Sequence, residues 1–193
     1  MENVENAVEN NANPTYIKEL DSVSFKREVS RALACIDQKA SSYNACILFD
    51  IDGSIVGTNG FILYKGKLNF KLDHKLVFKG EHLKSLVDIL DGKRPYLLEW
   101  NTETNEFKYM NQSMIIKPVL NQFYPNYNDA FPNYGPEDQR VSNLIFNSDQ
   151  FLRVLKSIGK GINFEISLGR DEKDPCIISI IDEPGKYVIM PVS

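Results

Sequence analysis

The fold of this chain is decided by two similar stretches, LVFKGEHLKSLVDIL at residues 76–90 and LIFNSDQFLRVLKSI at residues 144–158. Each opens with Leu, a branched aliphatic residue and Phe, passes through a short polar segment, and then repeats apolar residues at helical spacing. The endings also match, with MIIKPV at 114–119 and YVIMPV at 187–192. An internal repeat of this kind fixes the architecture of a chain. Because the repeated unit holds no reactive side chains, it indicates a scaffold and not an active site.

A further unit of the same kind begins near Tyr16. Its helix is indicated by apolar residues at i, i+4, i+7, i+8 and i+11, with Ser24 as the expected N-cap. These apolar residues are Phe25, Val29, Ala32, Leu33 and Ile36. Strands are expected at 46–51 and 54–58, joined by a tight turn at Asp52-Gly53, and a strand pattern continues over 61–72.

The other two units repeat this order of elements. Helices are expected over 80–91 and 148–158, each ended by a glycine. Strands are expected near 96–100, 106–110 and 113–118, and again near 162–168, 175–181 and 186–191. The sequence therefore predicts an α+β fold of repeated β-α-β-β-β units, with antiparallel sheets covered by helices on one face.

Two segments fall outside these units. Residues 1–15 are rich in Asn and Glu and are expected to form a disordered tail. Residues 123–139 hold Pro, Asn and Gly at a density that no strand or helix tolerates, so we expect a connector whose aromatic residues anchor it to the sheet. The predicted organisation is a complete domain of two units at 16–122 (16–72 and 73–122), the connector, and a single third unit at 140–193.

The composition is that of an ordinary soluble protein, because 42% of the 193 residues are hydrophobic and 25% are charged. No apolar run approaches the roughly 20 residues that a membrane span needs. The first residues lack the pattern of a signal peptide. Three widely spaced cysteines favour reduced thiols over a disulfide framework. We therefore expect a cytoplasmic protein that does not associate with a membrane.

Positive charge is concentrated on the predicted helices. Segments 24–39, 79–94 and 148–160 hold eleven basic and six acidic residues, a net charge of +5, so the rest of this −4 chain carries −9. One interpretation is a set of solvated helix faces. The other is a surface that contacts phosphates without reading sequence. The candidate DNA-facing residues are Lys26, Arg27, Arg31, Lys84, Arg153, Lys156 and Lys160.

One motif resembles a catalytic one. ILFDIDGS at 47–54 is similar to the first motif of haloacid-dehalogenase-type phosphatases, in which Asp50 would be the nucleophile and Asp52 the acid/base beside Mg²⁺. That family needs a helix in parallel α/β order next, whereas residues 54–72 alternate like strands. A β-hairpin with an Asp-Gly turn is the favoured interpretation. The two histidines, His74 and His82, suggest no metal site, and we expect no catalytic residue, metal or cofactor.

Three further motifs are YVIMPVS at the end of the sequence, GTNGFIL at 57–63 and YPNYNDAFP at 124–132. They resemble, in that order, the Y-V-[VI]-M-P-[MV] ending, the A-T-D-G-H-R-L loop and the F-P-[DN]-Y-x-x-x-[IL]-P connector of the bacterial β sliding clamp, the processivity subunit of the replicative DNA polymerase. They occur in the family's order with the repeats between them. The resemblance covers residues 16–193 and implies a DNA-clamp fold, a ring whose helices face duplex DNA.

The resemblance also implies a hydrophobic pocket for linear peptide motifs of polymerase or clamp-loader proteins. The positions that match it are Thr58, Gly60, Phe61, Ile62, Leu63, Pro125, Val188, Ile189, Met190, Pro191 and Val192. Phe61-Ile62 replaces the family's His-Arg pair, which makes the pocket more apolar. Ser193 stands where the family has Arg-Leu.

The chain is short for this family, which has six half-domains per subunit against three here. A lone third unit leaves a sheet edge and an apolar helix face without a partner. We therefore expect a homo-oligomer, a dimer or tetramer, in which two copies pair their single units across a two-fold axis. The leading hypothesis is a shortened sliding clamp that binds double-stranded DNA. The alternative is a clamp mimic that forms no ring and sequesters clamp-binding proteins.

Overall fold

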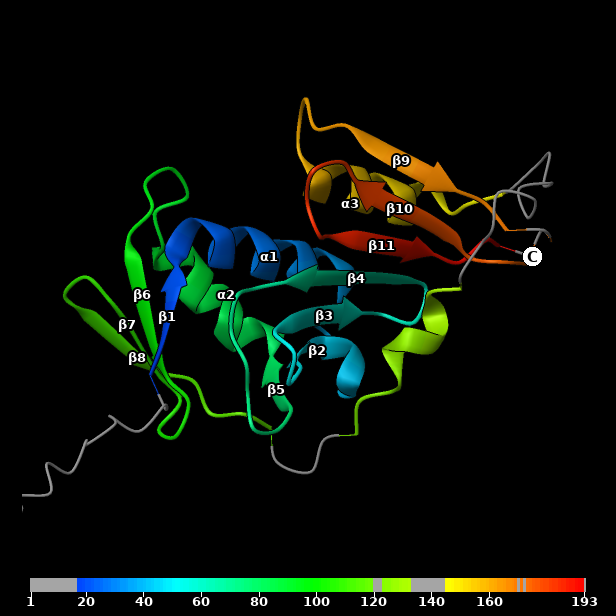
Figure 1. Ribbon diagram of the computed structural model, residues 1–193. Helices are drawn as coiled ribbons and strands as arrows, with labels where there is room; N and C mark the ends of the chain where they lie inside the picture. The colour runs from blue at the N-terminus through cyan, green and yellow to red at the C-terminus, as the bar shows by residue number, and fades with distance from the viewer. Residues whose placement is uncertain (1–16, 120–122, 133–144, 170, 172, 193) are drawn as a thin grey trace, which may run out of the picture.

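The computed structural model describes residues 17–119, 123–132, 145–169, 171 and 173–192. Every pair of strands in it is antiparallel. Four strands form one sheet in the order β1-β6-β7-β8, and seven form a second in the order β5-β2-β3-β4-β11-β10-β9. Figure 1 shows α1 between the two sheets, with α3 behind β10 and β11. The predicted α+β class is confirmed.

The elements follow the predicted repeat along the chain. The helices are α1 (Ser22–Cys35), α2 (Gly80–Ile89) and α3 (Ser148–Ile158). The first two units contain β1 (Ile17–Asp21), β2 (Cys46–Phe49), β3 (Ser54–Thr58), β4 (Ile62–Lys67), β5 (Leu76–Lys79), β6 (Leu97–Asn101), β7 (Glu106–Tyr109) and β8 (Gln112–Ile115). The third unit contains β9 (Phe164–Ser167), β10 (Cys176–Ile180) and β11 (Lys186–Ile189).

The first two units are interlocked by an exchange of strands. β1 of the first unit pairs with β6 of the second, and β5 of the second pairs with β2 of the first. Each exchanged strand runs directly into its own helix, so α1 and α2 pack against each other. Lys26 near the start of α1 donates from Nζ to the Leu90 carbonyl oxygen at the end of α2, 2.6 Å away. The two helices are therefore antiparallel.

The third unit joins the first through a strand pair. β11 pairs with β4, so that Val188 lies opposite Leu63 and Ile189 lies opposite Ile62. This pairing extends the sheet across both units. α3 packs beside α1. Within the described residues, β9 is the last strand of this long sheet.

Alternating side chains of the long sheet enter two separate cores. The larger core lies on the helix side and includes Phe49, Ile55 and an aromatic cluster around Trp100. The smaller core lies on the opposite face, where Leu48 and Val56 are covered by connector residues. Among these, Tyr124 donates to the Val56 carbonyl oxygen at 3.1 Å. The connector residues that pack on this face are Tyr124, Tyr127, Ala130 and Phe131.

Local structure departs from the sequence expectation at the start of α1. The N-cap is Asp21 and not Ser24, because the Asp21 side chain accepts from the Ser24 backbone N–H at 2.8 Å. The Asp-Gly turn between β2 and β3 forms as expected, and Gly53 takes a φ of 87° there. At Gly57 the backbone of β3 lies so close to the Ala32 carbonyl of α1 that a Cβ would collide with it. In the described part of the chain no helix is both long and apolar enough to cross a membrane.

Candidate nucleic-acid interface

A groove of about 700 Å³ lies between α1 and α3. Its basic residues come from two units far apart in the chain, and are Arg27, Arg31, Arg153, Lys156 and Lys160. Glu183 is the only carboxylate among its described lining residues. Five of the seven candidate DNA-facing residues are therefore brought to one concave surface.

Three of these cations are open to solvent. Arg153, Lys156 and Lys160 are exposed, and the Arg27 side chain is 40% exposed. Arg153 also donates from Nη2 to the carbonyl oxygen of Ile36, the C-cap of α1, at 2.9 Å. That contact places a positive charge at the negative end of the helix dipole. The exposed ammonium groups of Lys156 and Lys160 remain at the rim of the groove.

Arg31 is a correction to the sequence analysis. It was expected among the DNA-facing residues, but it is only 3% exposed. Its Nη1 pairs with Glu183 and lies 3.6 Å from Oε1 of Glu28, while its Nη2 donates to the Ile158 carbonyl oxygen at 3.4 Å. The third unit covers Arg31, and one sequence gives no sign of that packing. The guanidinium is thus occupied by partners inside the protein.

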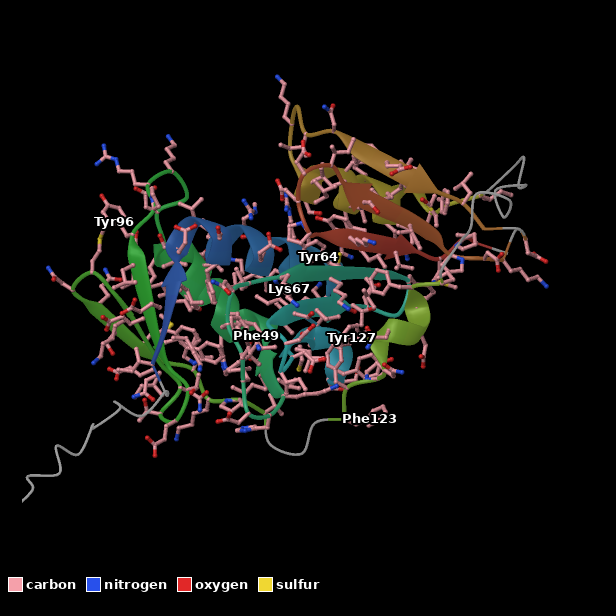
Figure 2. All side chains as sticks on the ribbon, viewed as in Figure 1. Phe49, Tyr64, Lys67, Tyr96, Phe123 and Tyr127 are labelled. Atoms are coloured by element: carbon pink, nitrogen blue, oxygen red, sulfur yellow. The ribbon has the colours of Figure 1, made fainter. Side chains whose placement is uncertain are left out.

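The partners of Arg31 belong to a buried polar network that sequence reasoning missed. Glu28 has no exposed surface, and it accepts from the Tyr64 hydroxyl at 2.6 Å and from Nε of Arg27 at 2.9 Å. Tyr64 lies on β4 beside α1 (Figure 2). The spacing did hold a signal, because Glu28 lies three residues after Phe25 and one before Val29, on the apolar face.

Electrostatics in this network follow from the buried charges. The hydrogen bond from Arg31 lowers the pKa of the Glu183 carboxyl below its ordinary value, against the opposing effect of burial. Burial, and then the neighbouring Glu28 carboxylate, raise the pKa of the Tyr64 phenol. Glu183 therefore stays ionised and joins the turn after β10 to α1 of the first unit.

The two remaining candidate cations lie outside the groove. Lys26 is half-buried and caps α2 through Leu90, so its charge is directed at a helix end. Lys84 is exposed on α2 and lies 3.1 Å from Oδ2 of Asp88, one turn further along the helix. Neither is close enough to line the cavity between α1 and α3.

The candidate peptide-pocket residues divide into a buried and an exposed set. The buried ones are Thr58, Ile62, Leu63, Val188 and Ile189, and the half-buried ones are Pro125 and Pro191. Thr58 fixes the loop, since its hydroxyl donates to the Ile62 carbonyl oxygen at 2.8 Å and accepts from the Gly60 N–H at 3.0 Å. Leu63 and Val188 belong to the smaller core under the connector. These residues support the surface and do not form its open face.

The exposed residues lie just outside two paired strands of the long sheet, before β4 begins and after β11 ends. The exposed fractions are 60% for Phe61, 37% for Met190 and 49% for Val192. Met190 donates its N–H to the Phe61 carbonyl oxygen at 2.9 Å, which holds the loop and the C-terminal segment together. Phe123 of the connector, 75% exposed, projects away from the sheets in Figure 2. We call Phe61, Met190 and Val192 the apolar end surface.

The phosphatase-like motif does not lie in the parallel strand–helix arrangement that the phosphatase reaction would need. Asp50 follows β2 in an antiparallel hairpin, and no parallel strand–helix crossover is present in the described residues. Its Oδ2 accepts from the Tyr127 hydroxyl at 2.7 Å and lies 3.5 Å from Nζ of Lys75. The described residues contain no cluster of three or more acidic, His or Cys side chains that could hold a metal. The carboxylate instead anchors the connector.

Comparison with known proteins identifies the architecture. No protein-family model and no curated protein sequence matches the chain. Among solved structures, the DNA polymerase sliding clamp from Bacillus subtilis superimposes with a TM-score of 0.75 at 16% identity, over 94% of this chain and 65% of that one. The chain has the sliding-clamp fold.

Other clamps give the same result. The sliding clamp from Pseudomonas aeruginosa matches at a TM-score of 0.74 and 16% identity, over 92% of this chain and 66% of that one. The DNA polymerase III beta subunit from Thermotoga maritima matches at 0.71 and 14% identity, over 92% and 65%. The resemblance stated from the sequence is thus confirmed for the fold. The chain spans about two thirds of the length of these clamps.

Proposed function

We propose that this protein is a sliding-clamp-like replication factor whose α1–α3 groove contacts the phosphates of duplex DNA without reading its sequence. The observation that carries the proposal is the convergence of cations from the first and third units on one concave surface. Phosphates are the natural partners of such a surface, and contacts to them fix position without reading bases. A clamp needs contacts of this kind, because it must slide.

The negative charge lies elsewhere on the molecule, which supports the same proposal. The three helical segments carry +5 and the remainder carries −9. An acidic remainder disfavours DNA at surfaces other than the groove. Arg31 contributes to the potential of the groove, but its ion pair with Glu183 keeps it from contacting phosphate directly.

The test is the salt dependence of binding to a fluorescent 30-base-pair duplex. Each phosphate contact contributes a slope of about −0.9 to log K against log [salt]. Replacing Lys156 and Lys160 together with Gln should weaken binding and make the slope shallower by about 2. The matched control is Lys108→Gln, which removes an exposed cation from β7 in the four-stranded sheet. Equal losses in both proteins would contradict the groove as the DNA site.

We further propose that the apolar end surface binds short linear peptides of polymerase or clamp-loader type. Phe61 and Met190 are held side by side by a backbone hydrogen bond and remain exposed. An adaptable thioether beside an aromatic ring suits Leu or Phe anchors. Fluorescence anisotropy with a labelled Leu-Phe peptide should show weaker binding after Met190→Ser. Ile51→Ser is the control, since Ile51 is 49% exposed in the β2–β3 turn.

Ring formation separates a working clamp from a clamp mimic. A closed ring stays on nicked circular DNA and slides off after the circle is cut. A mimic binds the Leu-Phe peptide but is retained on neither form. Gel filtration of protein–DNA mixtures before and after linearisation therefore decides between the two.

A further inference from the structure

In the part of the chain that the structure describes, the third unit lacks a strand that both other units receive. β2 and β6, the first strands after the helices of their units, are extended by β5 and β1 respectively. In each case the added strand comes from the opposite unit and leads straight into a helix. β9 holds the same place in the third unit, yet in the described chain it is the end of its sheet.

The strand registers identify equivalent positions in the second and third units. Met114 and Tyr187 open the repeated endings MIIKPV and YVIMPV, and they pair with Phe107 and Ile178. Ile178 pairs in turn with Ile166, just as Phe107 pairs with Trp100. Ile166 therefore corresponds to Trp100, and by the same register Phe164 corresponds to Leu98.

These equivalent positions differ sharply in burial. Trp100 and Leu98 have no exposed surface, whereas Ile166 is 42% exposed and Phe164 is half-buried. Isolated exposed apolar residues need no explanation, but here they occupy positions that the repeat elsewhere uses as core. The apolar residues of the third unit therefore lie at positions where the repeat packs against a second unit.

The helices show the same contrast. Phe151 and Leu155 on α3 are half-buried, while the matching residues of the repeat on α2, Leu83 and Val87, are buried. Leu152 adds a further side chain that is 47% exposed. An apolar helix face next to a bare strand edge marks the position where the opposite unit packs in the complete pair.

The chain also carries a segment that is equivalent to the strand such an edge needs. Val119 donates to the Val77 carbonyl oxygen on β5 at 2.7 Å, and Val192 donates to the Ile145 carbonyl oxygen at 2.8 Å. Because Val119 and Val192 both end the repeated motif, Ile145 corresponds to Val77 and Phe146 to Phe78. Phe78 pairs with Ile47 on β2 of the opposite unit, not with its own unit.

We propose that a second copy of this chain supplies the missing half, by reciprocal pairing of the Ile145–Phe146 segment of each copy with β9 of the other. The second residue before the helix pairs with the opposite unit in both known cases, Leu20 with Leu98 and Phe78 with Ile47. The repeat therefore sets Phe146 opposite the partner's Phe164. In a complete pair, the additional unit would be inserted between the connector and α3. The proposal therefore does not depend on where the sequence begins or ends.

The two copies of α3 would pack antiparallel, as α1 and α2 do. Each two-fold dimer would contain two complete domains and one composite domain. This inference rests on the repeat and not on DNA binding.

Sedimentation velocity of the whole protein tests the proposal in the absence of DNA. The wild type should be a dimer at micromolar concentration, and Ile166→Lys should shift it to monomer with an unchanged circular-dichroism spectrum. The control Ile51→Lys changes a residue of similar exposure on another surface and should remain a dimer. A monomeric wild type, or a dimer that survives Ile166→Lys, would overturn the inference.

The register has its own test by cysteine cross-linking. Directly opposite residues of antiparallel strands have Cα atoms about 4.5–5.5 Å apart, within the range of a disulfide. Phe146→Cys with Phe164→Cys should give a covalent dimer on a non-reducing gel, whereas Phe146→Cys with Glu165→Cys should not. The native Cys35, Cys46 and Cys176 are buried and present in both proteins. The strand exchange would be ruled out if the first variant stayed monomeric, or if both variants gave the same amount of covalent dimer.

Discussion

α2 and α3 have almost the same pattern of apolar residues but different surroundings. α2 lies against α1 and a sheet completed by strand exchange, and its core face is buried. α3 lies against α1 on one side only, and the corresponding face is half open. The same apolar pattern is thus buried where a second unit packs against it, and it stays half open in the third unit, where the described residues provide no such unit.

The largest difference in the free energy of unfolding is expected between a substitution at Trp100 and the same substitution at its counterpart, Ile166. Trp100 is fully buried and stacks on Phe107 at 5.2 Å, so Trp100→Ala should lower the free energy of unfolding by about 3–5 kcal/mol. In dilute, monomeric protein, Ile166→Ala should cost less than about 1 kcal/mol. Urea denaturation measures both. Similar losses would mean that the third unit is already packed within one chain.

A smaller difference in stability is expected between substitutions of two arginines that line the groove. Arg31→Met removes a buried guanidinium that pairs with Glu183 and lies 3.6 Å from the buried Glu28 carboxylate, so it should destabilise the protein by about 3 kcal/mol. Arg153→Met removes only an exposed side chain that caps α1, and should cost less than about 1 kcal/mol. DNA binding should show the opposite order, with Arg153→Met the more harmful. If the stability losses were equal, burial would not distinguish the two residues.

The smallest effect concerns pH and the link between the first and third units. The folded-state pKa of Glu183 is lowered below its ordinary 4.5, so its contribution to stability is present above that pH and is lost as the pH falls through the folded value. Glu183→Gln should be less stable than wild type near neutral pH by about 1–2 kcal/mol. The difference should shrink as the solution is acidified, in urea titrations at several pH values. A constant difference would show that the Arg31 pairing does not depend on the carboxylate charge.

Much of the fold could be predicted because its signals are local. Helical spacing placed α2 and α3 within a few residues of their observed ends. The Asp-Gly pair gave the β2–β3 hairpin, and the aromatic residues of the connector do pack on the sheet. These features depend on neighbours along the chain, which the sequence displays.

The site was less predictable because its geometry depends on contacts between units. Arg31 and Arg153 have the same charge, yet one is buried by the third unit and the other is open. Glu183 is not among the candidate residues of the sequence analysis, yet it pairs with Arg31. Nothing near these residues in the sequence indicates which partner approaches them.

The repeated unit, the class of fold and the concentration of positive charge on helices could be predicted from the amino-acid sequence, because they depend on spacing and composition. Three-dimensional packing was needed to show that the first two units exchange strands, that Arg31 is buried, and that β9 is the edge strand of its sheet within the described residues. Those outcomes arise from packing between segments distant in sequence, where burial and charge pairing are set by three-dimensional neighbours.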